Sequence, residues 1–176
     1  MALNRDLVIL VNSRDEETGT AEKLQAHIDG KLHRAISIFI VNDRSEMLLQ
    51  RRAAGKYHSG GLWTNACCSH PCPGESTPAA AARRLREELG FETELEPIGT
   101  LLYRSEVGAD LTEHEYDHLF AGTWTGVPQP DPAEVSETMW IDIPTLRRRL
   151  EENPEAFTAW FPQIFDIWAR HAQPRA

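Results

Sequence analysis

The sequence is poor in cysteine and lacks both long apolar runs and an excess of positive charge. Its three cysteines are odd in number and stand close together, at Cys67, Cys68 and Cys72. Such a set does not suit a disulfide framework and is typical of a reducing compartment. No apolar stretch approaches the roughly 20 residues that a membrane-spanning helix needs, and the opening Met-Ala-Leu-Asn-Arg-Asp does not have the layout of a signal peptide. We therefore expect a cytoplasmic protein that does not bind membranes.

Acidic residues outnumber basic ones. The chain holds 27 Asp and Glu against 18 Lys and Arg, a formal net charge of −9. This balance disfavours broad binding of nucleic acids or anionic membranes. An anionic substrate would need cations gathered locally, or a bound metal. The sequence also lacks internal repeats and linkers, and 176 residues with 41% hydrophobic content suit one ordinary core. These features predict a single domain over residues 1–176.

Short apolar segments bounded by turn residues predict a set of strands. They lie at residues 7–11, 35–41, 46–50, 98–103, 118–124 and 138–141. Apolar residues at helical spacing predict helices at residues 142–150 and 160–171. Strands interrupted by a few helices favour an α/β sandwich.

The most clearly marked helix ends at Gly90, a residue that readily adopts the left-handed conformation of a helix stop. Thr77 is the expected N-cap, and Pro78 suits the first helical position. The residues expected to face a core share helical spacing: Ala79, Ala82, Leu85 and Leu89. Arg84 and Glu88 stand one turn apart on another face, and taken alone they suit a surface salt bridge.

A thiol and an imidazole lie close together just before this helix. Cys68 and His70 are two residues apart. If residues 63–69 run as one strand, the two side chains point to the same side of it. A nucleophile or an acid would then lie beside a candidate metal ligand.

Two further histidines, His27 and His33, flank Asp29-Gly30, a favoured two-residue turn. A hairpin or tight loop would fold the two imidazoles toward each other. Taken singly, each histidine suits a surface position or a satisfied polar contact. Together with His70 they form a candidate ligand set, because histidine is the commonest metal-binding side chain.

A second cluster is acidic. Glu113 and Glu115 share one face if this segment is a strand, and His114 points to the other. Two carboxylates on one face repel each other unless a cation lies between them or one is protonated. The alternative is an exposed acidic edge strand.

Residues 74–75 and 83–91 resemble the Nudix box, a loop–helix–loop that holds magnesium and a diphosphate. The pattern departs from the family at Ser69, where glycine is usual, and at Arg84, where the hydrolases have a metal-binding glutamate. The arginine, together with Thr64-Asn-Ala-Cys-Cys-Ser-His-Pro71, is similar to the type 1 isopentenyl-diphosphate isomerases, which move a double bond and leave the diphosphate intact. This resemblance runs from about Asp6 to about Trp168. It implies a Nudix-like α/β/α sandwich with a mixed β-sheet.

The resemblance also implies two metal sites. One would hold Mn²⁺ or Mg²⁺, with Zn²⁺ as a competitor, through five side chains: His27, His33, His70, Glu113 and Glu115. The other would hold a Mg²⁺ bridged to the substrate diphosphate, through Glu88 and the backbone carbonyl of Cys68.

Four cations match diphosphate-binding positions of these isomerases: Lys23, Arg52, Lys56 and Arg84. Taken singly, Lys23, Arg52 and Lys56 are scattered enough in sequence to be ordinary surface charges. As a set they would explain why arginine replaces the hydrolase glutamate, since the site would hold phosphate as a spectator.

The implied reaction converts isopentenyl diphosphate into dimethylallyl diphosphate. It adds a proton to the terminal carbon and removes another beside the carbon that bears oxygen, so two acid–base groups must flank the alkene. By resemblance Glu115 is the acid, Cys68 takes the second proton as a thiolate, and Tyr103 hydrogen-bonds near the acid. Trp160 matches an indole that stabilises the carbocation, although a core aromatic on the last helix is the simpler alternative. We expect a monomer or weak dimer.

Two other functions remain open. A Nudix diphosphate hydrolase is the enzyme alternative. A zinc-binding interaction module built on Cys67, Cys68, His70 and Cys72 is the non-enzyme alternative, but it lacks a second paired cluster and leaves the acidic strand unexplained. Residues 57–59, Tyr-His-Ser, replace the aromatic–proline stretch usual in the isomerases, a difference that concerns closure of this loop.

Overall fold

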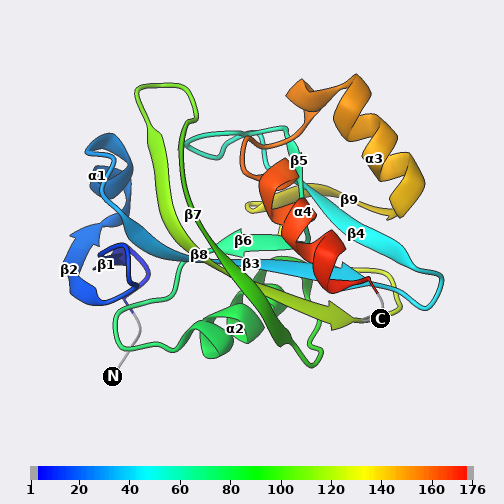
Figure 1. Cartoon of the computed structure of the whole chain (residues 1–176), viewed down its shortest axis with the longest axis horizontal. Coiled ribbons are helices and arrows are strands. Elements are labelled where there is room, and N and C mark those ends of the chain that lie inside the picture. The colour runs from blue at the N-terminus through cyan, green and yellow to red at the C-terminus, as the bar shows by residue number, and fades with distance from the viewer. Residues whose placement is uncertain (1–3, 174–176) are drawn as a thin grey trace.

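The computed structural model describes residues 4–173, which form a nine-stranded mixed sheet with helices packed against it (Figure 1). The strands are β1 (Leu7–Val11), β2 (Glu17–Glu22), β3 (His33–Val41), β4 (Glu46–Arg52), β5 (Trp63–Thr64), β6 (Cys67–Ser69), β7 (Glu96–Glu106), β8 (Thr112–Thr123) and β9 (Val135–Asp142). The helices are α1 (Lys23–Ile28), α2 (Thr77–Leu89), α3 (Ile143–Glu152) and α4 (Phe161–His171), with a short 3₁₀ turn at Pro154–Ala156.

Strand β3 is the centre of the sheet. It pairs antiparallel with β1, β4 and β6, and parallel with β8, which in turn pairs antiparallel with β7. Side chains alternate along it: Ile36, Ile38 and Ile40 pack toward α2, whereas Phe39 packs toward α4. A strand buried on both faces needs apolar residues at successive positions, as β3 has.

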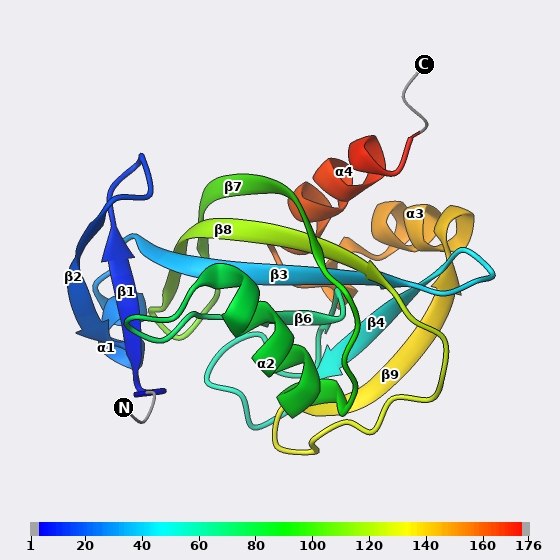
Figure 2. The same cartoon turned by 90° about the horizontal axis from the view of Figure 1, so that it is seen from below.

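Helices therefore cover both faces of the sheet. Figure 2 shows α2 along one face and α3 and α4 on the opposite side. The two apolar clusters agree, because Leu85 and Leu89 of α2 belong to one and Leu146 of α3 and Phe161 of α4 belong to the other. The expected α/β/α sandwich with a mixed sheet is confirmed. In the described part of the chain, no helix is long and apolar enough to cross a membrane.

Helix α2 lies where the sequence predicts it, but its start and its buried face differ. Ser76, not Thr77, is the N-cap, and its side chain accepts a hydrogen bond from the backbone N–H of Ala79. Gly90 ends the helix in the left-handed conformation, with φ +77°. The buried small residues are Ala80 and Ala81; the predicted Ala79 and Ala82 are exposed. Leu85 and Leu89 set the buried face, and Ala81 lies one turn before Leu85 on it.

The segment from Trp63 to Ser69 is not one continuous strand. The chain bends at Asn65 and Ala66, so β5 pairs with β4 whereas β6 pairs with β3. The Asn65 amide holds the bend by donating to the carbonyls of Ile38 and Cys67. The predicted strand was wrong in its continuity but right in placing residues 67–69 in an extended conformation.

Of the hairpin or tight loop expected at Asp29-Gly30, the structure has the tight loop, and the ring centres of His27 and His33 lie 4.8 Å apart. Residues 23–28 form the helix α1, whose first N–H groups, those of Leu24 and Gln25, donate to the side chain of Glu22. Asp29 is the C-cap, and Gly30 follows with φ +60°. The pair therefore ends a helix instead of joining two strands. Among the remaining predicted strands, the one at residues 7–11 has the predicted bounds and the others are longer. Asp142 caps α3 as its position predicts.

Candidate active site

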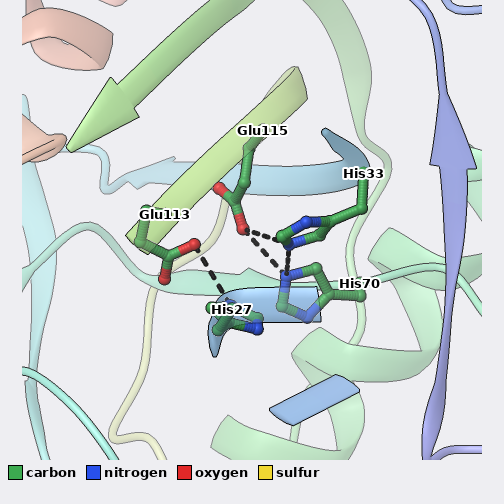
Figure 3. Close-up of side chains that lie close together, drawn as sticks. All are labelled: His27, His33, His70, Glu113 and Glu115. Carbon is green, nitrogen blue, oxygen red and sulfur yellow. Dashed lines mark hydrogen bonds and ion pairs between the residues drawn. The ribbon is translucent and has the colours of Figure 1, made fainter. Parts of the chain in front are cut away.

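Five side chains converge at one end of the sheet (Figure 3). They are His27 of α1, His33 of β3, His70 just after β6, and Glu113 and Glu115 of β8, and one ligand atom from each lies within 4.8 Å of all the others. The parallel pairing of β3 with β8 sets His33 opposite Glu115. The exposed-edge alternative for Glu113 and Glu115 is wrong, because β8 lies between β3 and β7 and both carboxylates are buried.

Backbone carbonyls orient two of the imidazoles. Nδ1 of His27 lies 2.7 Å from the carbonyl oxygen of Lys23, and Nδ1 of His33 lies 2.8 Å from that of Lys31. An N–H at Nδ1 donates to each carbonyl, which leaves Nε2 to face the cluster with its lone pair. Nε2 of His33 and Nε2 of His70 are only 3.2 Å apart. A cation would accept both lone pairs at once.

The charge states suit a cation as well. Burial disfavours ionisation of Glu113, but the adjacent His27 and His58 outweigh it and hold the Glu113 pKa well below its ordinary value. Burial and the Glu113 charge also disfavour ionisation of Glu115, yet the adjacent His33 and His70 leave its pKa lowered. Burial lowers the pKa of His70 to about 3, despite the adjacent Glu115. The cluster thus presents two carboxylates and a neutral imidazole.

Two buried polar atoms of the cluster make no hydrogen bond within residues 4–173: Oε2 of Glu113 and Nδ1 of His70. A buried acceptor without a donor is costly, on the order of 1–3 kcal/mol. Oε2 of Glu113 lies 3.3 Å from Nε2 of His27, on the side of the cluster. Three imidazoles and two carboxylates with a free oxygen fit a divalent metal ion of the Mn²⁺, Mg²⁺ or Zn²⁺ type.

Tyr103 and Glu115 form a buried pair. They are directly opposite in the β7–β8 register, and the Tyr103 hydroxyl donates to Oε2 of Glu115 over 2.5 Å. Burial and the negative charge of Glu115 raise the pKa of Tyr103 well above its ordinary value. The phenol therefore keeps its proton and remains a donor to the carboxylate.

Cys68 lies on β6, within reach of Trp160. Its Sγ lies 2.9 Å from Oδ1 of Asn65, to which the thiol donates, and 3.3 Å from Nε1 of Trp160, which donates to the sulfur. Ser37 Oγ is 3.4 Å from the same sulfur. Burial raises the pKa of Cys68 to about 12, so the resting group is a thiol. The indole N–H is a donor that favours a thiolate when one forms, whereas the Ser37 hydroxyl donates to Asp117.

The four predicted phosphate-binding cations line the same pocket as Cys68, Glu115 and Trp160. Burial and the neighbouring Lys56 and Arg84 lower the pKa of Lys23, as expected where like charges crowd together. Nε of Arg52 and Nε of Arg84 are buried and make no hydrogen bond to any described residue. A group of neighbouring cations with unpaired N–H donors is suited to binding an anion.

Arg84 and Glu88 are not the exposed pair that their spacing alone suggests. Nη2 of Arg84 lies 2.6 Å from Oε1 of Glu88, whose side chain is buried and accepts from Gln50 through its other oxygen. The same guanidinium nitrogen lies 3.2 Å from Oε1 of Glu134. Glu88 is thus at the pocket, beside Cys68, and its role toward a second cation stays a prediction.

The zinc-module alternative is wrong for the described residues. Cys67 packs into the apolar cluster under α2, and Cys72 is buried beside Arg83. The five-residue group that can hold a metal contains no cysteine. Side chains adjacent in sequence on a strand point to opposite faces, which separates Cys67 from Cys68.

Sequence reasoning gave no role to Glu134 and His58, which both line the pocket. Glu134 pairs with Lys56 and Arg84, and His58 contacts Glu113. Glu134 carries no local signal, because it meets its partners only through the fold. His58 was visible only as part of a departure from the family pattern.

Comparisons with known proteins agree with this geometry. A family model described as NUDIX domain matches residues 31–161. A relative from Burkholderia multivorans, named isopentenyl-diphosphate Delta-isomerase, is 50% identical over 154 residues, covering 88% of each chain. A relative of the same name from Pectobacterium atrosepticum is 49% identical over 165 residues, covering 92% of each. A crystal structure of a Deinococcus radiodurans protein matches with a TM-score of 0.74 over 95% of this chain and 99% of that one, at 19% identity, and so shows the fold alone.

Proposed function

Because the chain belongs to the isopentenyl-diphosphate Delta-isomerases of the NUDIX family, we propose that it interconverts isopentenyl diphosphate and dimethylallyl diphosphate by protonation and deprotonation of the alkene. One observation carries the assignment of its residues. The thiol of Cys68, the carboxylate of Glu115 and four cations line one pocket, beside the metal-type cluster, and Tyr103 donates a hydrogen bond to Glu115. Acid, base and anion-binding groups are thus within reach of one small substrate.

The resident metal is proposed to be Mn²⁺ or Mg²⁺, held by three histidines and two glutamates: His27, His33, His70, Glu113 and Glu115. A bound cation would neutralise the two buried carboxylates and increase the acidity of a proton held at the site. Zn²⁺ would compete for the same nitrogen-rich donor set. A second cation, Mg²⁺, would arrive with the substrate diphosphate and meet Glu88 and the carbonyl oxygen of Cys68.

The diphosphate is held and not cleaved. Lys23, Arg52, Lys56 and Arg84 supply the positive charge. Arg84 occupies the place of a hydrolase glutamate and reaches Glu88 over 2.6 Å. A guanidinium there binds phosphate oxygens but cannot ligate a metal that activates water. The diphosphate-hydrolase alternative is disfavoured for this reason.

The alkene lies between two proton-transfer groups in this proposal. Glu115, with Tyr103 donating to it, delivers a proton to the terminal carbon. Cys68 removes a proton from the carbon next to the one that bears oxygen. The tertiary carbocation between these steps needs a pocket with little water and a stabilising electron-rich face. Trp160, which is buried and donates its N–H to Cys68, supplies that face, an interaction of roughly 2 kcal/mol when desolvated.

The resting charge states say which proton must move between turnovers. The pKa of Cys68 is raised to about 12 and that of Glu115 is lowered, so at neutral pH the proton is on sulfur. This is the state that follows formation of dimethylallyl diphosphate. Each further forward turnover needs the proton to leave Cys68 and one to return to Glu115. Solvent hydrogen is therefore expected to enter the product.

Two broader features complete the proposal. Catalysis by Cys68 needs a reduced thiol, and all three cysteines are free, which favours the cytoplasm. A complete pocket within one chain makes a monomer or a weak dimer sufficient. The substrate is a small molecule.

The deciding experiment is phosphorus and proton NMR of the purified protein with isopentenyl diphosphate, Mg²⁺ and Mn²⁺ in D₂O. We expect dimethylallyl diphosphate that carries deuterium, with no phosphate released. Phosphate release without isomerisation would support the hydrolase instead. No reaction, with the metal present, would overturn both functions.

A further inference from the structure

His58 is a buried imidazole for which the proposed reaction has no role. It lies in the loop between β4 and β5, and its side chain is only 2% exposed. Nε2 of His58 lies 2.8 Å from Oε1 of Glu113. The group that can hold a metal does not include it. It is therefore a neighbour of a candidate ligand and not itself one of the ligands.

The other ring nitrogen of His58 also has a partner. Nδ1 lies 3.1 Å from Oγ of Ser59, so the hydroxyl can donate to Nδ1 while the N–H at Nε2 donates to Glu113. Nε2 carries a proton both in this neutral tautomer and in the charged form. The hydrogen bond to Glu113 thus does not depend on the charge of His58.

This contact divides the two oxygens of Glu113 between two tasks. Oε1 accepts from His58, whereas Oε2 makes no hydrogen bond to any residue from 4 to 173 and lies 3.3 Å from Nε2 of His27. A carboxylate held through one oxygen cannot rotate freely, so the other keeps its direction. That direction is toward the metal cluster.

The loop around His58 is fixed by the substrate-binding side of the pocket. The carbonyl of His58 accepts from Nη2 of Arg52 over 3.2 Å, and the Arg52 guanidinium lies 5.5 Å from the centre of the Trp160 ring. The His58 ring meets Trp160 edge-on at 5.9 Å. Ser59 adopts φ +52°, a conformation that non-glycine residues rarely adopt. These contacts thus hold the loop in one conformation.

We propose that His58 is a positioning residue, which holds Glu113 so that Oε2 faces the metal. The proposal rests on the metal site of the proposed function, but not on the isomerase reaction itself. It predicts that metal affinity depends on a hydrogen-bond donor at the place of Nε2.

Two amide substitutions separate positioning from packing. In His58→Gln the longer side chain can place an N–H near the position of Nε2, whereas in His58→Asn the amide ends near Nδ1 and falls short of Glu113. Both are neutral and polar. We expect His58→Asn to bind Mn²⁺ about 10–100-fold more weakly than the unmodified protein, as for other partners of metal ligands. His58→Gln should stay within about threefold, a small part of that range.

Mn²⁺ affinity is measured without substrate, by titration of the chelator-treated protein followed by electron paramagnetic resonance. The matched control is His118→Asn. His118 is on β8, as Glu113 is, but its Nε2 lies 2.8 Å from Oδ2 of Asp15, which is not part of the cluster. Its Mn²⁺ affinity should not change. In the activity assay, excess Mn²⁺ should restore kcat of His58→Asn and leave KM for the substrate unchanged.

Unchanged Mn²⁺ affinity in His58→Asn overturns the proposal, and so does an equal loss in His58→Gln. If His58→Asn fails to fold, His58→Phe replaces it, since phenylalanine keeps the ring and lacks the donor. Absence of Mn²⁺ binding by the unmodified protein also overturns it, whatever the activity. Mn²⁺ binding with the expected pattern but no isomerisation would support His58 and refute the proposed function alone.

Discussion

Individual side chains of this pocket owe their properties to burial more than to their type. Cys68 illustrates this: an exposed thiol titrates near pH 8.5, whereas burial raises the pKa of Cys68 to about 12. The indole N–H of Trp160, which donates to the sulfur, nevertheless stabilises the thiolate when one forms. Glu115 shows the opposite balance, because two histidines outweigh its burial. At neutral pH the proton is thus on the sulfur of Cys68 and not on Glu115.

Removal of the thiol isolates its chemical role. Cys68→Ala should abolish turnover, by at least the 10²-fold typical of a lost general base, because no other described side chain occupies its place on that side of the pocket. Fold and Mn²⁺ binding should be unchanged, since Cys68 Sγ is not among the cluster ligands. Circular dichroism, Mn²⁺ titration and the isomerase assay measure the three properties. Near-normal activity would exclude Cys68 from the mechanism.

Glu115→Gln should behave differently, because Glu115 belongs to both the acid pair and the metal cluster. We expect loss of activity together with at least a tenfold loss of Mn²⁺ affinity, on the order found for changes at metal sites. The same titration and assay measure both. A metal content equal to that of the unmodified protein would show that the five-ligand site is misassigned.

Glu134 should make the stability of the fold depend on pH in the acidic range. Burial opposes its ionisation, but Lys56 and Arg84 outweigh this and lower its pKa from 4.5 to about 2. A carboxyl whose pKa is lower in the folded state than in the unfolded state stabilises the fold at pH values above its unfolded-state pKa. This stabilisation is lost as the pH falls through the folded-state pKa. Glu134→Gln should thus be less stable than the unmodified protein at pH 7, with the difference shrinking between about pH 4.5 and pH 2.

Urea denaturation across that pH range measures the effect. Glu137→Gln is the matched control, since Glu137 lies on β9 with an exposed side chain 3.6 Å from Arg51, and exposed pairs contribute little. A difference for Glu134→Gln that does not vary with pH would contradict the assignment.

Among the secondary-structure elements, α2 is both clearly predicted by the sequence and part of the pocket. Its apolar face packs on the sheet through Leu85 and Leu89, and its other side carries Arg84 and Glu88 into the pocket. The predicted Arg84–Glu88 spacing was right because it depends only on the helical repeat. Its exposure was wrong because neighbouring elements bury it. The N-cap was wrong by one residue, since both Ser76 and Thr77 suit a cap and local sequence does not choose between them.

The N-cap can be tested directly. Ser76→Ala should lower the free energy of unfolding by about 0.5–2 kcal/mol, because the side chain accepts from the N–H of Ala79. Thr77→Ala is the matched control and should change stability by less than about 0.5 kcal/mol, since Thr77 is already within the helix. Urea denaturation of both variants measures the difference. A larger loss in Thr77→Ala than in Ser76→Ala would place the cap at Thr77.

The elements that sequence analysis missed are also informative. β2 spans Glu17–Glu22 and is almost wholly exposed, and α1 is only six residues long. Neither segment has an apolar periodicity long enough to predict a strand or a helix from sequence. Pairing with β1 holds β2, and contacts with β1, β2 and β8 hold α1. α1 brings Lys23 to the pocket and His27 to the candidate metal cluster, so a weakly marked element positions two candidate site residues.

In the whole molecule, the five-residue cluster ties separate parts of the chain together. Its ligands come from α1, β3, β8 and the segment between β6 and α2. A ligand that binds only the folded state stabilises it by mass action, by about 2.7 kcal/mol at a hundredfold excess over Kd. For a chain of 176 residues, this corresponds to a rise in Tm of roughly 5–10 °C.

We therefore expect Mn²⁺ to raise Tm of the chelator-treated protein by that amount, measured by scanning calorimetry. Glu115→Gln, which lacks one ligand charge, should show a much smaller rise. Ca²⁺ provides a second control, because it prefers oxygen ligands over imidazole. A Tm that does not respond to Mn²⁺ would argue against a metal site at this cluster.

The sequence by itself determined the α/β class and the position of α2, whereas the five candidate metal ligands and the four candidate phosphate-binding cations were predicted by resemblance to a family. Strand and helix periods and short motifs depend on residues close together in sequence, so they can be recognised without knowledge of the fold. Tertiary structure alone decided that β8 lies between β3 and β7, that Glu88 and Arg84 are buried, and that Glu134 and His58 enter the pocket. These facts depend on which distant segments pair. Burial and long-range charge then set the protonation states that the chemistry requires.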